Sequence, residues 1–393
     1  MGDLELILLV LAAFYVGETA HWLLPGSVLF VGHGGRRLRP RLLDTTATFR
    51  NAGGGVLFGS LLPWGEAASA RPYPLSLGTD GVLGFTAHHL GHDHRPTDDG
   101  RFLPWNEVRN IAADGRSVLV DGAALVRVDL PRTAAAVAED LKRLASLKPE
   151  RREKAIDSLI GEWFDDKKFT EEQSRLRSAS RGLQFTNTLL FAYFFILLPL
   201  MIWYGLRTFF LEWLIGYGAV AFLNIAVFYI THRRLFRERR GERWKRLLMM
   251  LISPADAARS RNHLFRDAAA TKHPLCAAVV WCSDDDTALV AERTLRDLDH
   301  PQLPVCRDGD ARSQQVEAAF RDQVADAARK LLERRGLDAR KFTNEPTPES
   351  TDSRSFCSRC TQQFREPAAT CNLCGLSSTV YAVSPAASAD AAS

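Results

Sequence analysis

The chain lacks the short motifs that mark the commonest enzyme sites. It contains no His-Glu-x-x-His, no Gly-x-Ser-x-Gly and no Gly-x4-Gly-Lys, which are typical of zinc proteases, serine hydrolases and phosphate-binding loops. The glycine-rich stretches His33-Gly34-Gly35 and Gly53-Gly54-Gly55 have no partner motif elsewhere in the chain. We therefore expect no catalytic residue set. The absence of these motifs favours a protein that is not an enzyme, and an enzyme stays the alternative.

A strong excess of charge is also missing. Fifty basic residues against 46 acidic ones leave a net charge of +4, so no nucleic-acid partner is expected. The basic residues instead gather on both sides of an apolar segment, which indicates an anionic membrane surface as a partner. They are Lys167, Lys168, Arg175, Arg177 and Arg181 before that segment, and Arg233, Arg234, Arg237, Arg239, Arg240, Arg243, Lys245 and Arg246 after it.

Charge is absent altogether from two long runs, Thr186–Leu206 and Trp213–Ile230. A helix of about 20 apolar residues crosses a bilayer core of about 30 Å and satisfies its own backbone there. The runs predict a transmembrane helical hairpin over residues 186–230, with Arg207–Glu212 as its loop, rather than a buried hairpin of a soluble protein. The spans hold no ionisable Asp, Glu, Lys, Arg or His, which argues against an ion-coupled transporter.

The flanking charges orient the hairpin, because Lys and Arg stay on the cytoplasmic side. Both of its ends should face the cytoplasm, and Trp203, Tyr204 and Trp213 should form an interfacial cluster at the outer end. The expected location is a bacterial inner membrane with cytoplasmic soluble domains. Within the hairpin, Pro199 predicts a kink, while Gly216 and Gly218 would permit close helix packing.

Seven cysteines, an odd number, argue against a secreted disulfide framework and suit a reducing compartment. Four of them form two Cys-x2-Cys pairs separated by ten residues, which together would complete a tetrahedral metal site with no open position. This pattern resembles a zinc ribbon over residues 356–376, and free thiols or a redox pair are the alternative. The resemblance implies structural zinc as the cofactor, with Phe356 and Phe364 packed over the site. The ligands would be Cys357, Cys360, Cys371 and Cys374.

The remaining clusters of metal-ligating residue types are weaker. Cys276 and Cys282 lie in an apolar run, so we expect buried small side chains rather than ligands. A second metal site would need a turn that brings together three of the histidines His88, His89, His92 and His94. The alternative is a solvated loop between strands, which the glycine within the stretch favours.

Residues 26–148 are expected to form a β-rich domain. Four Asp-Gly pairs suggest turns that need positive φ, and a helix should open at Pro131 with an apolar stripe of Val137, Leu141, Leu144 and Leu147. The expected strands are Pro74–Leu77, Val82–Phe85, Phe102–Trp105, Val108–Ile111, Val118–Val120 and Ala124–Val128, the last three forming a meander.

The stretch Leu-Pro-Trp-Asn-Glu-Val-Arg-Asn-Ile at residues 103–111, followed by a closing hairpin and one helix, resembles bacterial pleckstrin-homology-like domains. The resemblance covers about residues 70–148. It implies a small β-barrel or sandwich capped by a helix, and it does not imply phosphoinositide binding. An unrelated β-domain is the alternative.

The other segments are expected from their composition. Residues 1–25 should form an N-terminal transmembrane helix around the apolar run Leu6–Val16, and residues 149–185 a helical linker. Residues 231–340 should form a basic juxtamembrane segment and a helical region, with helices from Asp285 or Asp286 to Leu298 and from Ser313 to Arg335. Trp244 and Leu247–Ile252 would lie either at the headgroup boundary or in a buried helix. Residues 341–355 are expected to be a linker, and residues 377–393 a mostly disordered tail.

Together these expectations describe an α+β membrane protein. Its expected function is that of a membrane-anchored cytoplasmic scaffold or regulatory protein with a structural zinc site. It would contact membrane lipid and a protein partner at the cytoplasmic face, and no small-molecule ligand is identified. The alternatives are a metal-dependent enzyme that uses the His88–His94 loop and an accessory subunit of a membrane transport complex.

Overall fold

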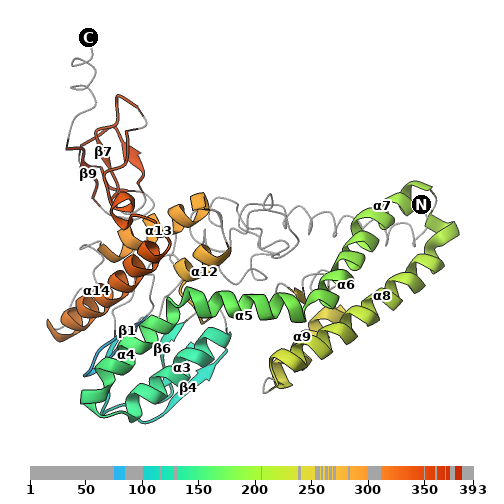
Figure 1. The fold of residues 1–393 in the computed structure, drawn as a ribbon, viewed down its shortest axis with the longest axis horizontal. Coiled ribbons are helices and arrows are strands. Elements are labelled where there is room, and N and C mark those ends of the chain that lie inside the picture. The colour runs from blue at the N-terminus through green and yellow to red at the C-terminus, as the bar shows by residue number, and fades with distance from the viewer. Residues whose placement is uncertain are drawn as a thin grey trace. The chain divides into compact units, whose positions relative to one another are not determined.

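The computed structural model (Figure 1) is of the α+β class, mostly helical with small antiparallel sheets. It describes residues 75–84, 101–115, 117–127, 131–204, 206–237, 240–252, 257, 260–261, 264, 268, 271–281, 284–299, 311–348, 350–358, 361–367, 369–371 and 377–382. The expected N-terminal transmembrane helix, the four histidines of the His88–His94 loop, Cys360, Cys374 and the tail beyond Ala382 lie outside the described residues.

The chain divides into two compact units. The described residues 167–268 form one of them, the hairpin unit, and the described residues up to 166 and from 271 onward form the other, the α+β unit. The β-rich segment and the helical and ribbon segments, which are far apart in the sequence, therefore share one unit.

Two three-stranded antiparallel sheets form the β-rich part of the α+β unit. The first holds β1 (Leu75–Leu77), β2 (Gly81–Gly84) and β3 (Arg101–Pro104), in that order. The second is the expected meander of β4 (Ile111–Asp114), β5 (Ser117–Val120) and β6 (Ala123–Arg127).

The first strand of the meander begins later than the expected Val108. The carboxylate of Asp121 accepts the amide of Asn110 at 2.8 Å and that of Arg109 at 3.4 Å, so these amides serve the β5–β6 turn instead of a strand. In that turn Asp121 has φ of 52° and Gly122 has φ of 82°. Two consecutive positive φ values define the turn that Asp-Gly favours between hairpin strands.

Helix α3 (Pro131–Ser146) lies against β4 and β5 (Figure 1). It buries Leu141 and Leu144 as expected, but the stripe continues through Ala134 and Ala138, while Val137 and Leu147 are only half-buried. The apolar stripe therefore lies on a slightly different face of the helix. The small side chains of the alanines at these buried positions let the helix approach the sheet closely.

The remaining helices of the α+β unit are α4 (Pro149–Trp163), α12 (Pro274–Trp281), α13 (Asp284–Asp299), α14 (Ala311–Arg334) and the 3-10 turn η4 (Ala339–Phe342). Helix α4, expected to be a linker, is a core element whose Trp163 ring packs edge-on against Phe320 of α14 at 6.2 Å. Helix α14 ends as expected at Gly336, where φ is 71° and the next amide reaches back to the carbonyl of Leu332. This is the glycine termination that helices commonly use.

The hairpin unit contains α5 (Asp166–Ala179), α6 (Arg181–Ala192), the π-helical turn η3 (Tyr193–Leu197), α7 (Leu198–Tyr204), α8 (Leu206–Leu235) and α9 (Arg240–Ile252). Figure 1 shows α6 and α7 running alongside α8. The expected loop Arg207–Glu212 is helical and belongs to α8. The segment contains no glycine or proline, so nothing in it interrupts the helix.

The π-turn η3 ends two residues before Pro199, the position of the expected kink. Proline has no amide to donate to the carbonyl four residues earlier, and a π-turn is a common way for a helix to absorb such a break. In the same region Gly216 of α8 faces Tyr193, where an added Cβ would lie 2.5 Å from the phenol oxygen. Gly216 thus permits close packing as expected, whereas Gly218 has nothing within 4 Å.

Residues Phe209–Leu235 of α8 form a helix long and apolar enough to cross a membrane, and only 17% of its most apolar window is buried. Large apolar side chains of α8 are exposed along its length, namely Phe209, Leu211, Leu214, Ile215, Phe222, Leu223 and Ile230.

Candidate functional site: an arginine pocket at the end of α8

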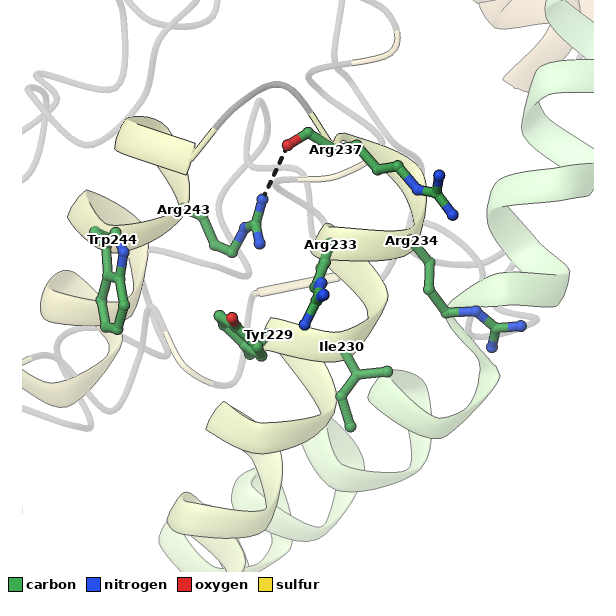
Figure 2. A pocket seen from close by; sticks show the side chains of 7 residues that line it. All are labelled: Tyr229, Ile230, Arg233, Arg234, Arg237, Arg243 and Trp244. Atoms are coloured by element: carbon green, nitrogen blue, oxygen red, sulfur yellow. Dashed lines mark hydrogen bonds between the residues drawn. The ribbon is translucent and has the colours of Figure 1, made fainter.

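A pocket of about 870 Å³ lies where the chain leaves α8 and turns back into α9 (Figure 2). The last turns of α8, the connection and the first turns of α9 all contribute to it. We call it the arginine pocket, and its lining residues are Tyr229, Ile230, Arg233, Arg234, Arg237, Arg243 and Trp244.

The local sequence explains why basic side chains gather here. The carbonyls at a helix C-terminus carry partial negative charge and favour cations, and α8 ends in His232, Arg233 and Arg234. Helix α9 is amphipathic, and its Leu247 and Met250 are buried in a core with residues of α6 and α8. Arg243 lies on that same face of α9 at helical spacing, so packing of the helix carries this arginine inward.

Arg243 is consequently only 5% exposed. Its guanidinium lies over the ring of Tyr229, 5.4 Å from the centroid, which is cation–π geometry. Its Nη2 donates long hydrogen bonds to the carbonyls of Phe236 at 3.5 Å and Arg237 at 3.4 Å. The Nε atom is buried and has no hydrogen-bond partner in the described structure. The guanidinium is thus held in place with part of its donor capacity unused.

The other three arginines of the pocket are exposed. Among the ion pairs formed by described residues, none involves Arg233, Arg234, Arg237 or Arg243. Figure 2 shows the guanidinium of Arg243 directed toward Arg233 and Tyr229. Like charges gathered in this way repel one another, and an anion placed among them would relieve that repulsion.

An apolar rim borders the charges. Trp244 is 57% exposed and its ring centroid lies 6.3 Å from that of Tyr229. Leu248 and Leu251 follow on the same outer face of α9 and are also exposed. Helix α9 therefore has a buried apolar face, as expected for a buried helix, and an exposed apolar face next to it. The position of the exposed face at a headgroup boundary stays a prediction.

The structure describes two of the four expected zinc ligands. Cys357 and Cys371 are buried and form no disulfide. Cys357 directly follows β7 (Ser355–Phe356), which shares a sheet with β8 (Gln363–Phe364) and β9 (Thr379–Val380). The described residues contain no group of three or more metal-ligating side chains, and the zinc site remains a prediction.

The aromatic contacts in the ribbon segment differ from the expected ones. Phe356 is buried and packs on Tyr381, with ring centroids 4.9 Å apart, while Phe364 is half-buried. Tyr381 lies in the segment expected to be mostly disordered, so composition alone gave no sign of this contact.

Two further features of the α+β unit concern residues outside the expected zinc set. Arg296 of α13 donates to the carbonyls of Ser358 at 3.2 Å and Asn344 at 2.5 Å, so it fastens the ribbon segment to the helical part of its unit. No sequence pattern marks this arginine. Cys276 is fully buried, and burial raises the pKa of its thiol to about 12, as expected for a structural rather than reactive cysteine.

Comparison of the chain with protein-family models, with curated proteins and with solved structures finds no match.

Proposed function

We propose that this protein is a membrane-anchored scaffold or interaction protein whose α+β unit serves as a cytoplasmic docking body. The observation that carries the proposal is the exposed apolar surface of α8. Soluble proteins rarely leave so long an apolar surface open to water. A bilayer covers such a surface at no cost to the helix, because the helix satisfies its own backbone hydrogen bonds.

The length of the hairpin fits this role. Helix α8 has 30 residues and is about 45 Å long. The 20 steps from Phe209 to Tyr229 cover about 30 Å, the thickness of a bilayer core. Trp203 and Tyr204 are exposed at one end of this span, and Tyr229 and Trp244 lie at the other. Aromatic side chains at both ends are typical of the two interfaces of a membrane.

Several buried polar side chains of the hairpin unit form hydrogen bonds within that unit. The Thr186 hydroxyl donates to Oδ1 of Asn224 at 2.6 Å, and the Asn224 amide donates to the carbonyl of Ala257 at 2.8 Å. Nearby, the hydroxyl of Ser260 donates to Asn187 at 2.9 Å. All of these residues except Ala257 are buried polar residues, and such contacts hold membrane helices together.

Cysteine labelling tests the proposal in the full chain. A cysteine introduced at Thr208, at the start of α8, should react with a membrane-impermeant maleimide in intact cells. A cysteine at Ser174, exposed on α5, should react only after the membrane is permeabilised. The protein should also stay in the membrane during alkaline extraction. Labelling of Thr208→Cys only in permeabilised cells, or release by alkali, would contradict the proposal.

A further inference from the structure

We propose that the arginine pocket binds the phosphate group of an anionic lipid. This inference rests on the proposed membrane anchoring. It goes beyond a general attraction between basic residues and an anionic membrane, because it names one pocket and one chemical group that binds there. It starts from Arg243, a residue that is only 5% exposed. Its guanidinium holds only long hydrogen bonds to two carbonyls, and its buried Nε has no partner. A buried charge of this kind is costly unless an anion accompanies it.

The arrangement favours phosphate over carboxylate. A carboxylate is planar and is satisfied by the fork of a single arginine. A phosphate carries oxygens in several directions and can accept from several guanidinium groups at once. The residues that line the pocket include arginines from the last turn of α8, from the connection and from α9. Figure 2 shows Arg233 and Arg243 close to one another on the side of Tyr229, while the side chains of Arg234 and Arg237 extend to the other side of the helix end.

The apolar side of the pocket points to a lipid as the source of that phosphate. Ile230 and Trp244 line the same pocket and are exposed, and Leu248 and Leu251 continue the apolar surface along α9. A lipid headgroup among the arginines could leave its acyl chains against this surface. Tyr229 and Trp244, as interfacial aromatics, would set the pocket at the depth where lipid phosphates lie.

The test measures binding to the full-length chain in detergent by calorimetry. Three probes are titrated: dihexanoyl phosphatidic acid below its micelle concentration, dihexanoyl phosphatidylcholine, and inorganic phosphate. The variant is Arg233→Gln/Arg237→Gln, which alters two exposed side chains and leaves the buried Arg243 in place. The matched control is Arg175→Gln/Lys245→Gln, which removes the same charge from two exposed positions outside the pocket lining.

We expect phosphatidic acid to bind more tightly than either other probe. The pocket variant should lose about tenfold or more in affinity, because each charge-assisted hydrogen bond contributes substantially to binding, whereas the control should stay within about twofold. An equal loss in the control would overturn the pocket as a specific site. Equal binding of inorganic phosphate would overturn the lipid as its ligand, and equal binding of phosphatidylcholine would overturn the preference for an anionic headgroup.

The result is separable from the test of the proposed function, because binding in detergent does not depend on how the hairpin inserts. A protein that inserts as expected but binds no phosphatidic acid overturns only the lipid site. A further variant, Arg243→Lys, keeps the charge and removes the planar fork and its Nε. It should also weaken binding of phosphatidic acid, and an unchanged affinity would contradict the role of the buried guanidinium.

Discussion

His273 shows how one buried side chain can serve as a structural cap. Its ring is 4% exposed and stacks on Phe164 with centroids 4.5 Å apart. Its Nδ1 accepts the amide of Leu275 at 3.0 Å, at the start of α12, where Pro274 occupies the first helical position. The first backbone amides of a helix have no partner within the helix, and Nδ1 of His273 accepts a hydrogen bond from one of them. The ring can accept only while Nδ1 is unprotonated.

Burial lowers the pKa of His273 from 6.5 to about 3, which predicts a loss of stability in acid. Between pH 6.5 and pH 3 His273 is protonated in the unfolded chain but stays neutral in the folded chain. The free energy of unfolding therefore falls as the pH drops below 6.5. At about 1.4 kcal/mol for each pH unit, the loss reaches about 2 kcal/mol at pH 5. His273→Asn keeps an acceptor without titrating, and denaturant unfolding of both proteins at pH 7 and pH 5 should give a smaller loss for the variant. Equal losses in both would contradict this role.

At the scale of elements, the packing of α6–α7 against α8 depends on a small residue. Gly216 lies against Tyr193, whose carbonyl also accepts from the indole Nε1 of Trp213 at 3.3 Å. Tyr193 is the first residue of the π-turn η3. The contacts that hold its ring and its carbonyl therefore also hold the π-turn.

Gly216→Ala should therefore destabilise the hairpin. The added methyl would meet the Tyr193 phenol oxygen at 2.5 Å, and overpacking of this kind costs about 1–3 kcal/mol. This cost opposes the gain of about 1 kcal/mol that alanine brings to a helix interior, so we expect the larger part of the range to apply. Gly218→Ala is a matched control, because nothing lies within 4 Å of its Cβ position, and alanine favours a helix by about 1 kcal/mol over glycine. Thermal unfolding in detergent should show opposite shifts for the two variants. A stabilised Gly216→Ala protein would show that the contact is not tight.

A second junction between elements centres on Asp166, the first residue of α5. Its buried carboxylate pairs with Arg334 at 3.2 Å and with Arg335 at 2.9 Å, both at the end of α14. Arg334 also donates to the carbonyl of Phe164 at 3.1 Å. The end of α14 thus holds the residues that directly follow α4, all of them within the α+β unit.

Asp166→Asn should lower the free energy of unfolding of the α+β unit by about 1–3 kcal/mol, because it weakens charge-assisted bonds at a buried site. The two arginines remain partly exposed, which keeps the loss below that of a fully buried pair. Asp322→Asn, at an exposed position of α14, is the control. Hydrogen exchange at the residues that directly follow α4 is the measurement, and equal protection in both variants would exclude the junction as a stabilising element.

At the scale of the whole molecule, the hairpin unit is inserted into the α+β unit. Among the described residues, the chain crosses between the units after residue 166 and before residue 271, and the stretches of the α+β unit next to these crossings are tied together. Lys272 Nζ donates to the carbonyl of Glu162 at 3.0 Å, and the His273 amide donates to that of Trp163 at 3.1 Å. The two connections to the hairpin therefore leave the α+β unit side by side.

The ribbon segment belongs to the same unit, and its expected zinc can be tested there. The purified full chain should carry one structural zinc ion, and Cys371→Ser should release it and expose residues 356–376 to protease. Cys276→Ser, at a buried cysteine of α12, should retain the metal. Elemental analysis by mass spectrometry gives the zinc content. A native protein free of zinc, whose ribbon segment still resists protease, would exclude the site.

Several features of the protein follow from the sequence by itself. The uncharged run Trp213–Ile230 predicts α8, Asp121-Gly122 predicts the β5–β6 turn, and Gly336 predicts the end of α14. Each of these depends on properties of a short segment, such as apolar length, permitted φ values and helix termination. Such properties act before any distant contact forms, so a local pattern can reveal them.

Tertiary structure alone decided which residues meet. The basic run after α8 predicts a charged surface, but only the reversal of the chain into α9 places Arg243 over the ring of Tyr229 and in the same pocket as Arg233. Likewise, only packing makes α4 a core helix and brings Arg296 to the carbonyl of Ser358, 62 residues away. The partner of a long polar side chain depends on how separate segments of the chain pack. The residues next to it in the sequence therefore do not predict that partner.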